Sequence, residues 1–287
     1  MKNVVLILII SFALFGCSSD PKKEKSSLIT DSASSSEVVA ITEQPVDKKV
    51  RSNAREQVRG QDMSSADFYA TLNGAIQAQN DEKIYQSAAQ ILTSSPSDLK
   101  ALNALAMYHY KRGRFELSRY LLGKAISANP KAGELYSNQG VVQLAQGEKR
   151  EATKSFRKAM ELNPNDAVAA SNLGAIYVQE RDFGKAQIVL ETAFKKGVRD
   201  ARVLNNYAIT LVSQGKHERA QDIYRGILKE NENNKEYLFN YAILLVESLG
   251  NYREGLEVIN RLKFVGGPPE TRNRIIALEN KAKAGLK

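Results

Sequence analysis

The 287-residue sequence has few of the residues on which catalytic, metal and redox sites depend. It contains one cysteine, two histidines and no tryptophan. A single cysteine cannot form a disulfide within the chain, and neither His109 nor His217 has a cysteine or acidic partner at metal-ligand spacing. No glycine-rich phosphate loop, HExxH or GxSxG motif is present. The sequence therefore argues against an enzyme and predicts no metal and no cofactor.

Proline and strand signals are also scarce. No proline occurs between Asn165 and Gly267, and no valine-rich alternating run is flanked by hairpin turns. Small and apolar residues instead recur at i, i+3 and i+4 along most of the chain, the spacing of amphipathic helices. The sequence predicts an all-α fold.

A period of 34 residues organises these helices. Prolines stand at 96, 130 and 164, and alanines at 125, 159 and 193. Within residues 133–164 two amphipathic stretches are separated by Gly147, and Pro164 ends the unit because proline cannot continue a helix. Each unit is predicted to be a helix-turn-helix hairpin, and a fixed period of this size is typical of a solenoid.

The repeat resembles the tetratricopeptide repeat (TPR), which has two helices in 34 residues. The fourth unit carries the resemblance at Leu173, Gly174, Tyr177, Ala186, Leu190 and Ala193. The third unit matches it at Gly140, Ala152, Phe156, Ala159 and Pro164. The resemblance covers roughly residues 65–267 and implies a TPR solenoid.

Six repeats and a cap are expected within the solenoid, which is assigned to residues 64–268. The repeats lie near 65–98, 99–132, 133–166, 167–200, 201–234 and 235–267, and a capping helix occupies 269–287. The sixth repeat carries one extra residue near Gly250, and in the fourth repeat Arg181 replaces the glycine between the helices.

The N-terminus reads as a lipoprotein leader, residues 1–16. Its apolar run from Val4 to Phe15 spans about 18 Å as a helix, well short of the ~30 Å hydrocarbon core, which favours a signal peptide. The stretch ending at Gly16-Cys17 resembles the bacterial lipobox. That resemblance implies that Cys17 carries the lipid, palmitate included, and is not a buried structural thiol. Ser18, in place of aspartate, implies the periplasmic face of the outer membrane.

Residues 17–63 are predicted to be the acylated N-terminus followed by a disordered tether. Between Ser18 and Asp62, eight basic and eight acidic residues cancel, and apolar surface is sparse. A short apolar patch, Val38 to Ile41, has two interpretations. It is either part of a solvated linker that holds the solenoid off the membrane, or a segment that docks on the solenoid.

Four asparagines are the candidate binding residues of the solenoid. In TPR folds the first helices of successive repeats line a concave groove, and one equivalent first-helix position holds Asn138, Asn172, Asn206 and Asn240. An amide can pair with the backbone of an extended peptide, or it can bond the neighbouring repeat. Apolar positions beside the series suit a peptide or a partner helix better than a small polar metabolite. They are Val141, Leu144, Ala175, Val178, Ile209, Val212, Ile243 and Val246.

Positive charge is concentrated in the second repeat, where seven basic residues face one acidic residue. The candidate basic patch comprises Lys100, Lys111, Arg112, Arg114, Arg119 and Lys124. These side chains either form a solvated face or attract an acidic partner or a phosphate-rich membrane surface. Nucleic acid is a poor candidate partner for an exported lipoprotein.

The layout of lipobox, tether and about six TPR units resembles the pilotin lipoproteins of type IV pili and the TPR lipoproteins of Flp (tight adherence) pili. That resemblance implies a protein-binding scaffold that assists assembly of an envelope machine such as a pilus secretin. An accessory lipoprotein of gliding motility, or of the enzymes that synthesise or hydrolyse the cell wall, is the alternative.

Overall fold

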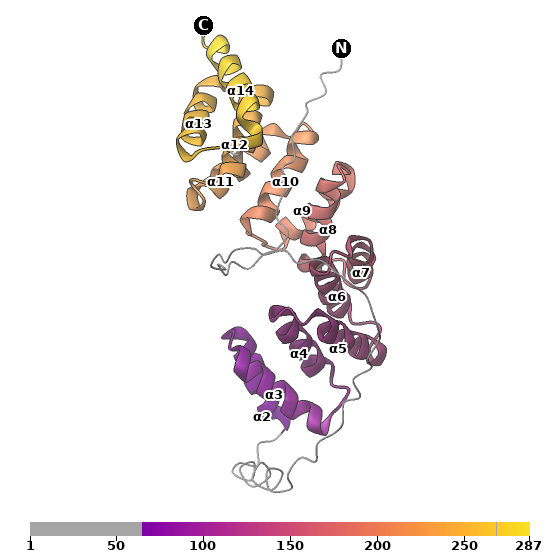
Figure 1. Cartoon of the computed structure of the whole chain (residues 1–287). Coiled ribbons are helices and arrows are strands. Elements are labelled where there is room, and N and C mark those ends of the chain that lie inside the picture. Colours follow the sequence, from indigo (N-terminus) through magenta and orange to yellow (C-terminus); the bar gives the residue numbers. More distant parts are fainter. Residues whose placement is uncertain (1–64, 268) are drawn as a thin grey trace, which may run out of the picture.

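The computed structural model describes residues 65–267 and 269–287, and over this range the chain is helical with no strand. Among these residues twelve α-helices, α2 to α13, follow one another as six antiparallel pairs along an elongated array, and a thirteenth helix, α14, ends it (Figure 1). The all-α prediction is confirmed. The leader, Cys17, the tether and the Val38 patch lie outside the described residues.

Each pair consists of a first and a second helix. The first helices are α2 (Ser65–Gln77), α4 (Leu99–Lys111), α6 (Gly133–Ala145), α8 (Ala167–Gln179), α10 (Ala201–Ser213) and α12 (Lys235–Ile243). The second helices are α3 (Asp81–Ser94), α5 (Phe115–Ala128), α7 (Lys149–Leu162), α9 (Phe183–Lys195), α11 (His217–Glu230) and α13 (Tyr252–Val265). The π-helix η1 (Leu244–Leu249) extends α12, and the 3₁₀ turn η2 (Pro269–Thr271) leads into α14 (Arg272–Gly285).

The first helices begin where the sequence supplies a short polar cap. Asp98, Asp166, Asp200 and Asn234 precede α4, α8, α10 and α12, and each side chain accepts a hydrogen bond from a backbone N–H in the first turn. Such a cap satisfies one of the donors left unpaired at a helix start and is worth about 1 kcal/mol. Ala132 holds this position before α6 without a side-chain bond.

The turn inside each hairpin needs one residue in the left-handed region. Gly113, Gly147 and Gly215 hold it with φ between 71° and 80°. In the fourth repeat Arg181 takes the same conformation with φ 59°, at a cost of roughly 1–2 kcal/mol for a residue with a side chain. The arginine therefore replaces the glycine without changing the path of the hairpin.

The extra residue of the sixth repeat is taken up inside its first helix. Residues 244–249 form a π-helix, in which one residue is inserted into the α-helical ladder, and Gly250 follows with φ 65°. The second helix of this repeat can therefore pack in its usual place, and Ile259 and Leu262 of α13 are fully buried.

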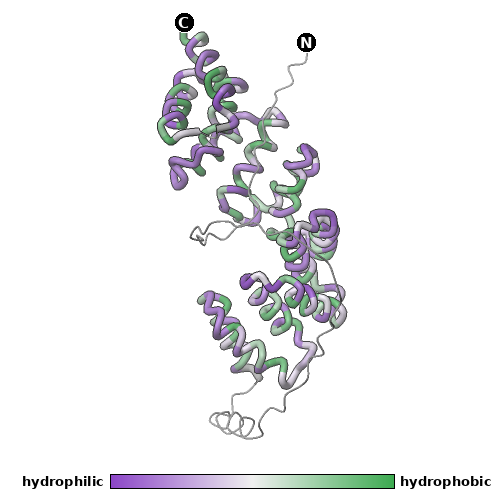
Figure 2. Tube along the Cα trace, in the orientation of Figure 1, coloured by the Kyte–Doolittle hydropathy of each residue, from purple (hydrophilic) through white to green (hydrophobic). Residues whose placement is uncertain are grey.

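The core is continuous along the solenoid because small residues let the helices of a pair approach closely. A Cβ on Gly140 would lie 2.6 Å from Phe156, and one on Gly174 would lie 2.3 Å from Leu190. Hydrophobic and hydrophilic stretches are interspersed along the helices from one end of the solenoid to the other (Figure 2). At the C-terminal end, α14 buries Ile275, Leu278 and Ala282 against α12 and α13. Within the described range no helix is both long and apolar enough to cross a bilayer.

Candidate functional site

The first helices form one surface of the solenoid, called here the inner face. Helices α4 and α6, α6 and α8, and α8 and α10 contact one another directly, whereas α5, α7, α9 and α11 each contact the first helix of the next repeat. Side chains on the exposed side of the first helices are therefore neighbours across repeats.

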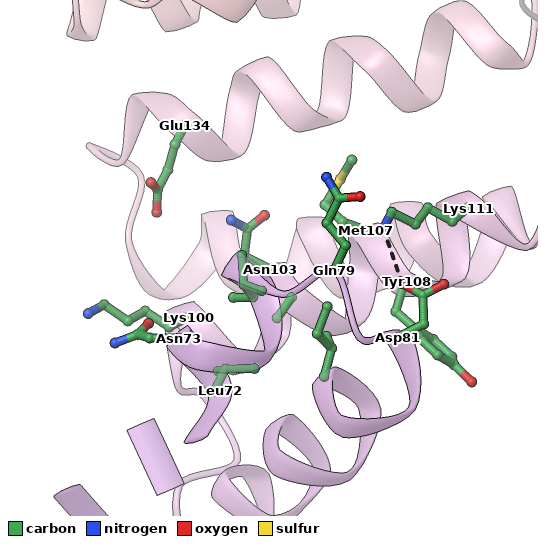
Figure 3. A pocket seen from close by; sticks show the side chains of 13 residues that line it. Leu72, Asn73, Gln79, Asp81, Lys100, Asn103, Met107, Tyr108, Lys111 and Glu134 are labelled. Atoms are coloured by element: carbon green, nitrogen blue, oxygen red, sulfur yellow. Dashed lines mark hydrogen bonds and ion pairs between the residues drawn. The ribbon is translucent and has the colours of Figure 1, made fainter. Parts of the chain in front are cut away.

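A pocket of about 420 Å³ opens on the inner face between the first two repeats, and it is called here the α2–α4 pocket (Figure 3). Its floor is apolar and consists of Leu72, Ile76, Ile84, Ala104, Met107 and Tyr108. Ile76 remains 47% exposed. An exposed isoleucine beside half-buried Met107 and Tyr108 offers a partner apolar surface that the solenoid itself leaves uncovered.

The rim of the α2–α4 pocket is polar and carries Asn73, Gln79, Asp81, Lys100, Asn103, Lys111 and Glu134. At one end, the Lys111 Nζ lies 3.1 Å from an oxygen of Asp81, and Arg112 lies 3.3 Å from the other oxygen. Lys100 lies at the opposite end, beside Asn73 in the view of Figure 3. Exposed ion pairs of this kind are worth at most about 1 kcal/mol, so they shape the rim more than they stabilise the fold.

The four asparagines of the predicted series differ in their partners. Asn138 donates from Nδ2 to Oδ1 of Asn103 at 2.7 Å, and Asn240 donates in the same way to Asn205 at 3.2 Å. Both bonds join adjacent repeats. Asn172 instead donates to the carbonyl of Val168, one turn earlier in its own helix, at 2.9 Å.

The residue that each asparagine faces in the preceding repeat explains this difference. Asn138 and Asn240 face asparagines. The corresponding partner position for Asn172 holds Ser137, whose hydroxyl already donates to Asp166 at 2.6 Å. For Asn206 it holds Ser171, whose hydroxyl donates to the carbonyl of Ala167. Asn138 and Asn240 are thus engaged in bracing the repeats, while the half-buried amides of Asn172 and Asn206 face the inner surface without such a bond in the described part of the chain.

The predicted apolar floor beside these asparagines is open only in part. Val178, Ile209, Ile243 and Val246 are at most 2% exposed, so they pack between helices and offer a ligand very little surface. The half-buried positions are Val141, Leu144, Ala175 and Val212. The same repeat position as Ala175 is occupied by Asn73 and Met107 in the first two repeats, where the α2–α4 pocket lies.

The six basic residues of the second repeat do not form one surface. Lys100 and Lys111 line the α2–α4 pocket, and Arg112 stacks on Tyr108 with 3.8 Å from its guanidinium carbon to the ring centre. Arg119 lies on α5 and pairs with Glu148 of the third repeat at 3.0 Å. The exposed side chains of Arg114 and Lys124 lie in the turn before α5 and on α5 itself.

Perturbed ionisable groups concentrate at the fifth and sixth repeats. Burial raises the pKa of Glu236, although the hydrogen bond from Asn205 at 3.0 Å opposes this shift. Burial would likewise raise the pKa of Glu254, but bonds from Arg225 and Tyr241 outweigh it and hold the pKa below its usual range. Burial and the bond to Glu254 raise the pKa of Tyr241 to about 12.

These groups brace helices and show no arrangement suited to bond making or breaking. Among residues 65–267 and 269–287, no three His, Cys, Asp or Glu side chains gather as metal ligands. His109 is buried, and burial together with the charges of Arg114 and Arg112 lowers its pKa, which favours the neutral imidazole. The chemistry that the inner face offers is burial of apolar surface and hydrogen bonding by amides.

Comparisons with known proteins agree with this architecture. Residues 103–167 and 143–208 match two sequence models of the tetratricopeptide repeat. The structure is similar to YrrB, described as a TPR protein with an unusual peptide-binding site, with a TM-score of 0.55 and 16% identity over 62% of this chain and 92% of YrrB. It is also similar to a point mutant of MamA, with a TM-score of 0.51 and 18% identity over 58% of this chain and 96% of MamA.

PilF of Pseudomonas aeruginosa is similar at 19% identity over 65% of this chain and 88% of PilF, with a TM-score of 0.49, which is too low to carry an argument. No curated protein matches the chain in sequence. At these identities the solved structures show the fold alone. The predicted TPR solenoid is confirmed, and TPR solenoids are protein-interaction scaffolds.

Proposed function

We propose that this protein is a lipid-anchored scaffold that binds a protein partner on its inner face. The α2–α4 pocket carries the proposal, because an open apolar floor with amide and charged groups at its rim is the anatomy of a protein-binding surface. The half-buried amides of Asn172 and Asn206 extend the same face into later repeats and can receive the backbone of an extended peptide.

The anchor rests on the sequence. The lipobox ending at Cys17 supports lipidation, and Ser18 supports the periplasmic face of the outer membrane as the location. Replacing Cys17 by Ser should release the protein from sedimented membranes and abolish labelling with palmitate. A variant that still sediments with outer membrane and still takes up label would refute the anchor.

The machine that such a scaffold serves is proposed to be a type IV or Flp pilus secretin, which the protein helps to assemble. The overall layout, a lipobox followed by a tether and six TPR units, resembles that of the pilotin lipoproteins of type IV pili and of the TPR lipoproteins of Flp pili, and this resemblance supports the proposal. Gliding motility and the enzymes of cell-wall synthesis or hydrolysis are the second candidates, supported by the same layout.

A pull-down from membranes with the intact lipoprotein separates these candidates. Recovery of a secretin supports the first, and recovery of a penicillin-binding protein or a wall hydrolase in its place supports the second. Wild-type protein is compared with Ile76→Glu, which places a charge on the floor of the α2–α4 pocket. A matched control is Ile188→Glu, because Ile188 is 70% exposed on the second helix α9.

A further inference from the structure

We propose that the α2–α4 pocket binds a segment of the protein's own N-terminal region, residues 37–43, whose apolar side chains are Val38, Val39, Ala40 and Ile41. This inference goes beyond the proposed function and does not depend on it. Its basis is the pocket, the position of the pocket next to the start of the solenoid, and the charge and length of the chain that precedes Ser65.

The position of the pocket favours an occupant from the same chain. The pocket lies between the first two repeats, and α2, which supplies Leu72, Asn73 and Ile76, is the first described helix. Because α2 has 13 residues, the pocket is within about 20 Å of Ser65 along this helix. Residues 42–64, 23 in number, connect Ile41 to Ser65. Even at the 1.5 Å rise of a helix these 23 residues span about 35 Å, so they are long enough for the segment to reach the pocket.

The segment is apolar and flanked by acidic residues, so it complements an apolar pocket floor that has a lysine at its rim. Its four apolar residues are flanked by Glu37 and Glu43, and from residue 26 to residue 47 the chain has four acidic residues and no basic one. The pocket presents an apolar floor with Lys100 and Glu134 on one side of its rim, and no ion pair of Lys100 occurs within the described residues. At the other end, Asp81 is already shared by Lys111 and Arg112. Val38, Val39 and Ile41 can therefore be buried on the floor while the carboxylate of Glu37 or Glu43 lies beside Lys100.

Attachment makes even a weak contact effective. A short linker gives two parts of one chain an effective concentration in the millimolar range, so a contact with a Kd near 1 mM would be occupied about half of the time. A protein partner that uses the same floor must displace the segment. The N-terminal region would then reduce the apparent affinity for that partner until the partner competes successfully.

Cysteine trapping tests this contact in the full chain. Cys17 is the only cysteine, so the Cys17→Ser variant is a background without thiols. In that background, Ala40→Cys is paired with Asn73→Cys at the pocket. The matched control pairs Ala40→Cys with Ala175→Cys, which occupies the same repeat position three repeats further along the inner face. Disulfide formation is followed under mild oxidation at low protein concentration.

We expect the pocket pair to cross-link at least tenfold faster than the control pair. Adding Val39→Asp and Ile41→Asp should slow cross-linking of the pocket pair, since the apolar contact is lost while the length of the chain is unchanged, and should leave the rate of the control pair as it was. Lys100→Glu should slow trapping at low salt more than at high salt, because screening weakens the charge contribution.

Two results would overturn the proposal. Equal rates for the two pairs would show that residues 37–43 do not favour the pocket. Faster cross-linking between two chains that each carry one of the cysteines than within one chain would assign the pocket to a second copy. Circular dichroism of each variant distinguishes a lost contact from a lost fold.

Discussion

Removal of the buried amide of Asn240 tests how adjacent repeats are held together. Asn240 is 8% exposed and Asn205 is 2% exposed, and the 3.2 Å bond between them joins the sixth repeat to the fifth. In Asn240→Ala, Oδ1 of Asn205 stays buried without this donor, while Nδ2 of Asn205 keeps its bond to Glu236. Losing a hydrogen bond and stranding a buried acceptor costs about 1–3 kcal/mol.

The loss is expected to appear as a lower melting temperature. For a chain of this size 1 kcal/mol corresponds to about 2–4 °C, so Asn240→Ala should melt roughly 2–12 °C below wild type. Because a solenoid's stability is a sum over repeats and their interfaces, unfolding should begin at the C-terminal repeats. Circular dichroism with temperature and with urea measures the first effect, and amide hydrogen exchange locates the second.

Asn206→Ala is the matched control at the same position one repeat earlier. The Asn206 amide is half-buried and bonds no neighbouring repeat in the described structure, so its removal should change stability by less than about 0.5 kcal/mol. Equal melting temperatures for wild type and Asn240→Ala, or an equal loss in both variants, would refute the distinction between bracing and free amides.

Three further predictions concern packing and charge. Gly174→Ala should destabilise the fold by about 1–3 kcal/mol, because its Cβ would lie 2.3 Å from Leu190. Gly123→Ala is the control and should not destabilise the fold, because its Cβ would meet open space. A urea titration in which Gly123→Ala loses more stability than Gly174→Ala would contradict the packing argument. The raised pKa of Glu236 means that its contribution to stability is fully present below the unfolded pKa of about 4.3 and is lost as pH rises through the folded pKa. Glu236→Gln should therefore gain stability relative to wild type between pH 4 and pH 7. Glu254, with its lowered pKa, contributes stability above the unfolded pKa that is lost as pH falls through the folded value, so Glu254→Gln should be less stable than wild type at pH 7 and approach it in acid. Matching pH profiles for the two variants would contradict both assignments.

The fold could be predicted from the sequence because the same local pattern of residues recurs every 34 residues. Each hairpin needs two amphipathic stretches, a left-handed residue between them and a small residue where the helices meet. Gly140 and Gly174 supply the close contacts, and Gly113 and Gly147 supply the turns. These requirements are local, so the pattern of residues predicts them directly.

The sixth repeat shows what the pattern leaves open. The sequence has one residue too many before Gly250, but such a residue can enlarge a turn or enter a helix. The structure places it in the π-helix at 244–249, where Leu244, Leu245 and Val246 are all buried. The gain from keeping these side chains and α13 packed depends on tertiary contacts, which a repeat pattern does not contain.

The candidate site could be predicted only in part, because it too depends on tertiary contacts. One repeat position gives the asparagine series, yet the role of each amide depends on a second position, which holds Asn103 and Asn205 in two repeats and serine in two others. The α2–α4 pocket was missed because Asn73 is polar and because the first repeat is the least regular of the series. The position of Asn73 and Met107 in the repeat, equivalent to Ala175, was the available signal.

The most direct test of the central claim, that a protein partner binds the inner face, compares two isoleucines. Ile76→Glu on the pocket floor and Ile188→Glu on α9 introduce the same charge at exposed apolar positions on different faces. With the partner recovered from membranes, titration calorimetry should show at least a tenfold loss of affinity for Ile76→Glu and wild-type affinity for Ile188→Glu. Unchanged affinity for Ile76→Glu, with a loss for Ile188→Glu, would contradict the account and place the partner on the second helices.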